Sequence, residues 1–310
     1  MNYYTTEKQN KSFPGKTTTL ITLVISLACC TIHLINEGII YMAGLLAVLT
    51  AGFVMQRISH AEMFLKKRTE LPLVLFLLFS VTNNALPPVS EATIAIFCFV
   101  AMLYEIFKTF QAPQATLRSF NAGVYLGIAS LFLPQMLFLM PLIWLEMYNF
   151  RSLETKSFLA SLSGTATVYW ILFAWCVWTR DFSTCTEWFN DLARIDFLWK
   201  GTYLQSHGQT MWEILLLTLI SCFCVKKEIH NNSLRTRLML SSLITISLLL
   251  AVLIFLYGNK AGIIQTILHL PAAVLIAYFF ETVKHRIRFL LYYLMLILLS
   301  FSFIAGIWNF

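Results

Sequence analysis

FNAGVYLGIASLFLPQMLFLMPLIWLEMY, residues 120–148, is the stretch of sequence on which the fold of this chain depends. It is about 29 residues long and mostly apolar, with Pro134 and Pro141 inside it. A helix that crosses a bilayer needs about 20 apolar residues, so the stretch is long for one crossing and short for two. It can form one kinked helix, two short helices or a re-entrant hairpin. Pro134 is the expected break, because proline lacks an N–H and disfavours helix in the residue before it.

The rest of the chain is equally apolar. Of its 310 residues, 58% are hydrophobic and only 12% are charged, whereas soluble domains carry about 25% charged residues. The apolar residues form long runs rather than the spaced stripe of a soluble helix, which excludes an ordinary soluble protein. Nine spans are expected outside residues 120–148, at 17–35, 38–56, 71–86, 89–107, 157–178, 210–225, 238–257, 262–280 and 289–308.

The basic residues favour two crossings for residues 120–148. Lys and Arg collect in short cytoplasmic loops. Two crossings place 18 of the 22 Lys and Arg in the cytoplasm, and the four outside are Arg180, Arg194, Lys200 and Lys260. One crossing would divide the 22 residues 13 to 9. A re-entrant hairpin gives the same sides as two crossings.

We therefore predict an all-α protein, a polytopic transmembrane helical bundle with about eleven crossings (ten to twelve). Its N-terminus is expected in the cytoplasm and its C-terminus outside. Residues 1–310 form a single transmembrane domain, in which residues 1–16 are a cytoplasmic tail. The expected location is the bacterial inner (cytoplasmic) membrane.

Residues 179–209 form the longest segment between spans and are expected outside. Trp188, Leu192, Ile195 and Trp199 recur there at i, i+4, i+7 and i+11. This pattern predicts an amphipathic helix in the membrane interface. The helix can be an anchor, because Trp is enriched at that depth, or a lid over a lipid-facing site. Trp188 and Trp199 are therefore candidate substrate-binding residues.

Acidic residues show the opposite asymmetry to the basic ones and make the outer face mildly acidic. Sorting of Lys and Arg to the cytoplasm accounts for this by itself. Acids beside an apolar groove are also what a membrane enzyme would use as a general base or metal ligand. The candidate catalytic residues are Glu91, Asp181 and Glu37.

A polar corner is expected at residues 83–91. Asn83 and Asn84 end one span, a Pro-Pro turn follows, and Ser90 and Glu91 begin the next span. Ser is a common N-cap, and Glu in a first turn favours the helix dipole, so capping explains these two residues. Asn83 and Asn84 remain candidate substrate-binding residues.

Ionisable residues inside the spans are few. Glu146 is close enough to the cytoplasmic end of its span to snorkel, and His269 can stay neutral within its span. The histidines lack H-x-x-x-H or H-E-x-x-H spacing, and the seven cysteines follow no metal-ligand spacing. No metal site and no cofactor are therefore predicted. Nor is nucleic acid an expected partner, since the basic residues act as topology signals.

Residues 120–170 resemble a family of multi-pass inner-membrane proteins from Bacteroidota that is known only as a domain of unknown function. The resemblance lies in the run from Gly123 to Leu131, the Pro134 break, and the Arg151 loop followed by Gly164. More distantly, this order of sequence features is similar to that in lipid-linked sugar glycosyltransferases of the GT-C type. In those enzymes the catalytic acid lies in a long first outer loop, which here is only residues 36–38.

Three functions remain open. The favoured one is the handling of a lipid-linked saccharide or envelope precursor at the outer leaflet, whether or not the protein is an enzyme. The second is a secondary transporter or flippase, because discontinuous helices often mark binding sites. The third is a non-catalytic subunit of an envelope membrane complex. The expected partners are the lipid bilayer, a polyprenyl-linked or other lipid substrate, and other membrane proteins.

Overall fold

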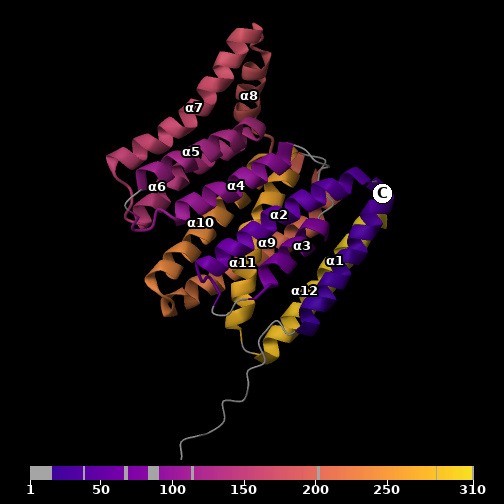
Figure 1. Ribbon diagram of the computed structural model, residues 1–310. Coiled ribbons are helices and arrows are strands. Elements are labelled where there is room, and N and C mark those ends of the chain that lie inside the picture. The colour runs from indigo at the N-terminus through magenta and orange to yellow at the C-terminus, as the bar shows by residue number, and fades with distance from the viewer. Residues whose placement is uncertain are drawn as a thin grey trace, which may run out of the picture.

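The structure is a computed structural model that describes residues 16–37, 39–65, 69–82, 91–112, 115–200, 203–283 and 285–308. These residues are almost entirely helical, and only an isolated bridge between Asp196 and Tyr257 has β geometry within the described ranges. The all-α prediction is confirmed (Figure 1). The α-helices are α1 (Lys16–Glu37), α2 (Ile39–Ala61), α3 (Leu71–Thr82), α4 (Glu91–Phe107), α5 (Ala115–Phe132), α6 (Met140–Asn149), α7 (Thr155–Thr179), α8 (Ser183–Ala193), α9 (Tyr203–Glu228), α10 (Leu234–Leu256), α11 (Ala261–Thr282) and α12 (His285–Trp308). Four short 3-10 turns join them: η1 (Pro134–Leu139), η2 (Leu198–Lys200), η3 (Ile229–Asn231) and η4 (Gly258–Lys260).

Four helices among the described residues are long and apolar enough to cross a membrane. They are α7, α10, the segment Gly258–Thr282 that contains α11, and residues Ile287–Ile304 of α12. They indicate a membrane protein. The prediction of about eleven crossings is wrong by this criterion. The apolar described parts of α1, α3 and α4 (Thr19–Ile32, Leu71–Thr82 and Thr93–Phe107) are shorter than a bilayer requires, and α6 has only 10 residues.

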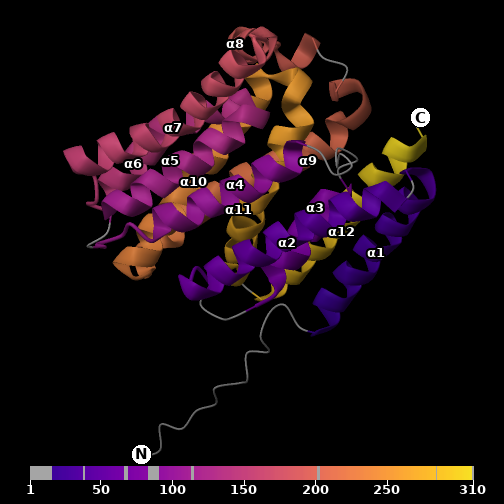
Figure 2. The same ribbon diagram turned by 45° about the horizontal axis from the view of Figure 1, so that its top comes forward.

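The break at Pro134 turns the chain back. Leu133 is extended, with φ −135° and ψ 90°, and η1 and α6 follow it. The partners of α5 along α7 rise in the same order on both helices: Gly123 lies against Ser161, Gly127 against Val168, and Ser130 against Tyr169. Helices α5 and α7 are therefore parallel. The chain leaves α5 at one end and enters α7 at the other, so η1 and α6 together run back between these ends (Figure 2).

This return decides between the readings of residues 120–148. The interpretation of residues 120–148 as a single kinked helix that continues in one direction is wrong. Side-chain contacts mark the path of the returning limb: Met140 Sδ lies 3.8 Å from the Thr165 hydroxyl, and the Trp144 indole N–H donates to Ser161 Oγ at 3.0 Å. Both partners lie on α7, and the later residue of the limb contacts the earlier residue of α7. The limb is therefore antiparallel to α7.

Two glycines bring α5 and α7 close together. A Cβ on Gly123 would lie 2.1 Å from the Ser161 carbonyl oxygen, and a Cβ on Gly164 would lie 2.3 Å from that of Phe120. Only glycine fits at these positions, because backbone atoms cannot move aside as side chains do. The Thr165 hydroxyl also donates to the Gly123 carbonyl at 3.0 Å. Close packing through small residues is how helices associate in membranes.

Helix α11 lies at the centre of the bundle. In its span 94% of the residues are buried, and it packs against α3, α9 and α10. His269 is fully buried in it, with its ring 5.9 Å from the Phe79 ring of α3. Neither ring nitrogen has a hydrogen-bond partner among the described residues. Pro271 follows two residues later within the helix.

Helix α7 lies at the periphery, and only 28% of its span is buried. Together with α8 it projects from one side of the bundle (Figure 1). Its exposed aromatic residues are named here the α7 aromatic face: Trp170, Phe173, Trp175 and Trp178. Trp178 is 85% exposed. A patch of this kind is unfavourable in water, and it fits a hydrocarbon or interfacial environment.

The charged residues gather at two opposite ends. At one end, Glu62 after α2 pairs with Lys108 after α4, 3.3 Å apart, and with Arg235 at the start of α10. Arg118 at the start of α5 pairs with Glu105 of α4 there, also at 3.3 Å. We name this the basic end. The opposite end, named the α8 end, contains the end of α5, α8 and the α10–α11 turn.

Candidate binding site beneath α8

Helix α8 is fixed over the end of α5. The indole N–H of Trp188 donates to the Ser130 carbonyl oxygen at 2.7 Å, and the Trp188 ring lies 5.1 Å from the Tyr169 ring of α7. At the other end of α8, the Tyr257 hydroxyl donates to the Leu192 carbonyl oxygen at 3.0 Å. Helix α8 is therefore tied to α5, α7 and the end of α10.

The chain after α8 pairs with the turn between α10 and α11. The Gly258 N–H donates to the Asp196 carbonyl oxygen at 2.6 Å, and the Asn259 amide donates to Asp196 Oδ2 at 2.7 Å. A Cβ on Gly258 would lie 2.7 Å from Leu198 Cα, so the two backbones meet closely. Arg194 Nε lies 3.0 Å from Asp196 Oδ2 and completes the junction.

A small polar pocket of about 60 Å³ lies within this junction, and we name it the α8 pocket. It has room for a hydroxyl-bearing group or a few water molecules. The Lys260 ammonium lies 3.9 Å from Asp191 Oδ2 across it. The lining residues are Gln135, Asp191, Arg194, Asp196, Tyr257, Asn259 and Lys260.

Gln135 is buried in the wall of the pocket, with 1% of its surface exposed. Its Nε2 donates to the Asp191 carbonyl oxygen at 3.2 Å. Its Oε1 has no donor in the described part of the chain. A buried acceptor without a partner costs about 1–3 kcal/mol. The pocket is therefore suited to a molecule that brings an O–H or N–H to this oxygen.

Comparison with protein families matches residues 16–309 to a family described as a family of unknown function (DUF6427). The chain belongs to this family. The match extends the resemblance seen in residues 120–170 to nearly the whole chain, without bearing on taxonomic origin or on GT-C enzymes. Comparison with curated proteins and with solved structures found no match.

Of the three predicted catalytic acids, Asp181 is the one whose side chain the structure of this DUF6427 chain describes. Asp181 is exposed, and its Oδ1 accepts the Ser183 N–H at 2.9 Å where α8 begins. Hydrogen bonds from Ser183 hold the pKa of Asp181 below its usual value. Glu37 ends α1 and Glu91 begins α4, and the side chains of both lie outside the described residues. Their catalytic role stays a prediction.

The two tryptophans among the predicted binding residues lie in different environments. Trp188 is buried and anchors α8, whereas Trp199 is 65% exposed and stacks on Phe197 with ring centroids 4.7 Å apart. Asn83 and Asn84 lie outside the described residues. Within the described ranges, no group of three His, Cys, Asp or Glu side chains is arranged to hold a metal ion.

The predicted amphipathic helix is shorter than its pattern. Helix α8 ends at Ala193, so Ile195 and Trp199 do not lie on it. Arg194 is already extended, with ψ 104°, because Asp196, two residues later, pairs with the α10–α11 turn. The periodicity of four apolar residues therefore continues beyond α8, with Ile195 outside any helix and Trp199 in the 3-10 turn η2. The prediction that all four residues lie on one amphipathic helix is wrong.

Sequence reasoning missed the pocket residues Gln135, Tyr257 and Asn259. One signal could have found them: the topology put the Pro134 break, residues 179–209 and Lys260 on one side of the membrane. Polar residues next to these points would then lie on one surface of the protein. The pairing of Asp196 with Gly258 was not accessible, since it joins segments about 60 residues apart in the sequence.

Glu146 also departs from the expectation. It does not snorkel to the surface: it is 1% exposed, and its Oε1 accepts the Thr245 hydroxyl of α10 at 2.6 Å. Its Oε2 has no hydrogen-bond partner among the residues that the structure describes. Packing of α6 against α10 encloses the carboxyl group, which was not apparent from its distance to the end of the apolar run.

Proposed function

We propose that this chain is a multi-pass protein of the bacterial inner membrane that binds the polar head of a lipid-linked saccharide or related envelope precursor at the outer leaflet. The binding site is the α8 pocket. The observation that carries the proposal is Gln135, a buried amide that lines a polar pocket and whose oxygen has no donor among the described residues.

The distribution of charges supports the orientation that we propose. Lys and Arg favour the cytoplasmic side, so the basic end is cytoplasmic and the α8 end faces outward. The N-terminus is then in the cytoplasm and the C-terminus outside. The parallel arrangement of α5 and α7 supports this reading, because it places Arg118 and Lys156 at the same end, with Arg194 and Lys260 at the other.

The chemistry of the pocket suits a polyhydroxylated group. A sugar hydroxyl both donates and accepts a hydrogen bond. Gln135 Oε1, Asp191 and Asp196 offer acceptors, while Lys260 and Asn259 offer donors. The pocket is far smaller than the 300–1,000 Å³ of ordinary ligand sites. It therefore receives one edge of a head group, and the rest of the molecule lies outside it.

A lipid-borne substrate also fits the neighbouring surface. The α7 aromatic face adjoins α8, because Phe173 lies 6.5 Å from Phe182 and Tyr169 contacts Trp188. An isoprenoid or acyl chain beside α7 would bring its head group to the level of α8. The substrate approaches from the membrane and not from the aqueous phase.

The test uses Gln135→Leu, which keeps the size of the side chain and removes its polar atoms. In cells that lack the gene and show an altered envelope glycan, Gln135→Leu is expected to fail to restore it, and the purified variant is expected to lose a lipid-linked saccharide detected by native mass spectrometry. Glu187→Ala, which removes an exposed acid of α8, is the control and is expected to restore both. Equal restoration and equal lipid content in Gln135→Leu would contradict the proposal.

A secondary transporter or flippase is the second candidate, and Glu146 is the observation that favours it. A buried carboxyl group between membrane helices is a functional candidate by default, and this one lies in the returning limb after the Pro134 break. Proton-driven uptake into proteoliposomes that is abolished by Glu146→Gln and retained by Glu105→Gln would favour transport. Absence of substrate movement and of proton coupling would reject it.

A further inference from the structure

We infer that the cytoplasmic half of α2 carries a site for an anionic phospholipid, with its phosphate at Arg57 and one acyl chain in a groove between α1, α2 and α3. The site lies at the opposite end of the bundle from the α8 pocket. It is independent of the function proposed above, except that both place the basic end in the cytoplasm.

The apolar part of the site is a groove of about 410 Å³. Its α2 members Leu46, Leu49 and Phe53 are three or four residues apart and so share one face of the helix. Among the described residues that line the groove, Thr50 is the polar one, and its hydroxyl donates to the Ala47 carbonyl oxygen at 2.7 Å. No polar group of the groove therefore opposes a hydrocarbon chain. The lining residues are Leu23, Leu46, Leu49, Thr50, Phe53, Leu73, Val74 and Leu77.

The basic part begins one helical turn beyond Phe53. The Arg57 guanidinium carbon lies 4.9 Å from the centre of the Phe53 ring, so the charge is held at the end of the apolar groove. A second hollow of about 520 Å³ continues from Arg57 between α2 and α4. It is lined by Val54, Arg57, Ile58, His60, Ala61, Tyr104 and Lys108.

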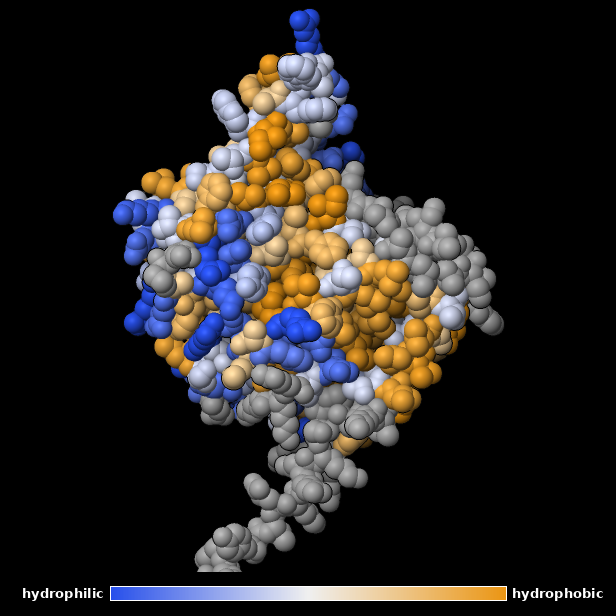
Figure 3. Space-filling model, in the orientation of Figure 1, coloured by the Kyte–Doolittle hydropathy of each residue, from blue (hydrophilic) through white to orange (hydrophobic). Residues whose placement is uncertain are grey.

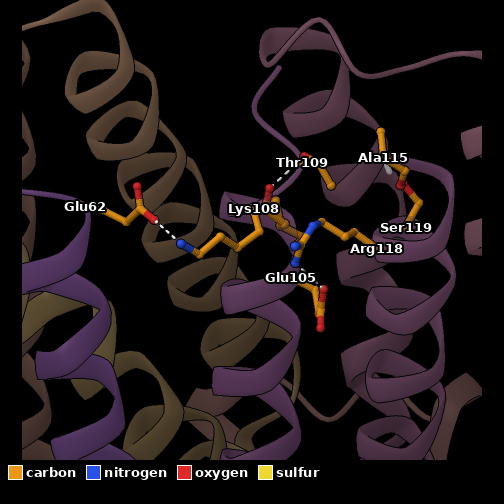
Figure 4. Close-up of polar contacts among 8 residues, drawn as sticks. Glu62, Glu105, Lys108, Thr109, Ala115, Arg118 and Ser119 are labelled. Carbon is orange, nitrogen blue, oxygen red and sulfur yellow. Dashed lines mark hydrogen bonds and ion pairs between the residues drawn. The ribbon is translucent and has the colours of Figure 1, made fainter. Parts of the chain in front are cut away.

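The charges around this hollow are not balanced. Lys108 reaches from the end of α4 to Glu62 at the end of α2, as Figure 4 shows, and Glu62 also pairs with Arg235. One carboxylate therefore serves two bases. Arg57 is exposed and has no ion pair among the described residues; its partner is the Phe53 ring. A phosphate group would supply the missing negative charge.

The dimensions match one leaflet of a bilayer. Eleven residues separate Leu46 from Arg57, or about 16 Å along a helix, and half of a 30 Å hydrocarbon core is about 15 Å. A phosphate at Arg57 therefore places the end of its acyl chain near Leu46. Figure 3 shows hydrophobic residues over α1, α2 and α3, with hydrophilic residues near the C-terminal end of α2. Basic pockets between helices on the cytoplasmic side are typical sites for anionic head groups.

The test measures lipids retained by the full chain in mild detergent, by native mass spectrometry, after titration with phosphatidylglycerol or phosphatidylcholine. The natural sequence is expected to retain phosphatidylglycerol preferentially. Arg57→Gln is expected to weaken that retention about fivefold, the usual contribution of one basic residue at an anionic membrane surface. Lys156→Gln, which removes an exposed charge at the same end, is the control and is expected to change little.

A second variant tests the acyl groove. Leu49→Trp fills the groove from α2 and is expected to reduce retention of phosphatidylglycerol while leaving the protein monodisperse on gel filtration. Three outcomes would overturn the inference: equal losses in Arg57→Gln and Lys156→Gln, equal retention of the two lipids, or full competition by millimolar inorganic phosphate. The last would identify a phosphate site without a lipid.

Discussion

Helices α7 and α11 are both long and apolar enough to cross a membrane, yet they occupy opposite environments. In α11 94% of the span is buried, and in α7 only 28%. Helix α11 encloses His269 at the centre of the bundle, whereas α7 turns Trp170, Trp175 and Trp178 outward. Hydropathy therefore predicts that both helices avoid water, but it does not distinguish the central helix from the peripheral one. Lipid tails are as apolar as a protein core, so the same residue types suit either place.

The two helices are also held differently. Large side chains surround α11 on several sides, and Leu268 and Phe280 are completely buried. Helix α7 is held mainly along one line, where Gly123 and Gly164 bring its backbone against α5. Truncation of a side chain should therefore damage α11 most, and enlargement of a glycine should damage α7 most.

The largest expected effect on stability comes from truncating a buried side chain of α11, compared with an exposed side chain of α7. Leu268→Ala in α11 removes a fully buried side chain and is expected to lower the free energy of unfolding by about 2–5 kcal/mol. Ile171→Ala in α7, where the side chain is 69% exposed, is expected to change it by less than about 0.5 kcal/mol. Reversible unfolding in mixed micelles measures both. Equal losses would remove the distinction between core and periphery.

The next effect comes from enlarging a glycine at the close contact between α5 and α7. Gly164→Ala places a Cβ 2.3 Å from the Phe120 carbonyl oxygen, and the shift this forces is expected to cost about 1–3 kcal/mol. Ala174→Leu, a larger change on the exposed side of α7, is the control and is expected to leave stability unchanged. Thermal unfolding followed by tryptophan fluorescence compares them. If Gly164→Ala were as stable as the natural sequence, the close approach of α5 and α7 would be incorrect.

A smaller, local effect is expected where α7 and α8 meet. Trp188→Phe keeps an aromatic ring but loses the hydrogen bond to the Ser130 carbonyl, worth about 1 kcal/mol. Helix α8 should open more often, so limited proteolysis within residues 183–200 should accelerate about fivefold at unchanged global stability. Phe189→Leu, on the exposed side of α8, is the control. An unchanged cleavage rate in Trp188→Phe would show that this bond does not hold α8.

The smallest effect concerns pH at the start of α8. Because the folded pKa of Asp181 is lowered by its bonds with Ser183, its contribution to stability is present above the usual carboxyl pKa of about 3.9 and is lost as pH falls through the folded value. Helicity of α8 measured by hydrogen exchange should therefore decline slightly in acid. In Asp181→Ala this decline should be absent, and a decline of equal size would assign it to another group.

Much of the fold was predictable from local sequence. The apolar runs located the helices, and Pro134 marked the break because it cannot continue a helix. The positive-inside count also chose a returning chain over a continuing one for residues 120–148, as the parallel α5 and α7 confirm. These features depend on residues close together in the sequence or on sums over whole loops.

The candidate site was less accessible. The α8 pocket depends on Asp196 meeting Gly258 and on Gln135 lying under both, and no local pattern encodes such contacts. The same holds for the central position of α11 and the enclosure of Glu146 by α10. The apolar periodicity also extends beyond the end of α8, because pairing with the α10–α11 turn overrides the helical preference at Arg194.

Because the chain returns after Pro134, we expect the α8 pocket and the basic end to lie on opposite sides of the membrane, with the pocket outside. Single cysteines at Arg194 and Lys156, introduced into a chain whose own cysteines are replaced, test it with a membrane-impermeant maleimide. We expect labelling of Arg194→Cys in intact inner-membrane spheroplasts, and of Lys156→Cys only after the membrane is permeabilised. Labelling of both positions before permeabilisation, or of Lys156→Cys alone, would contradict it.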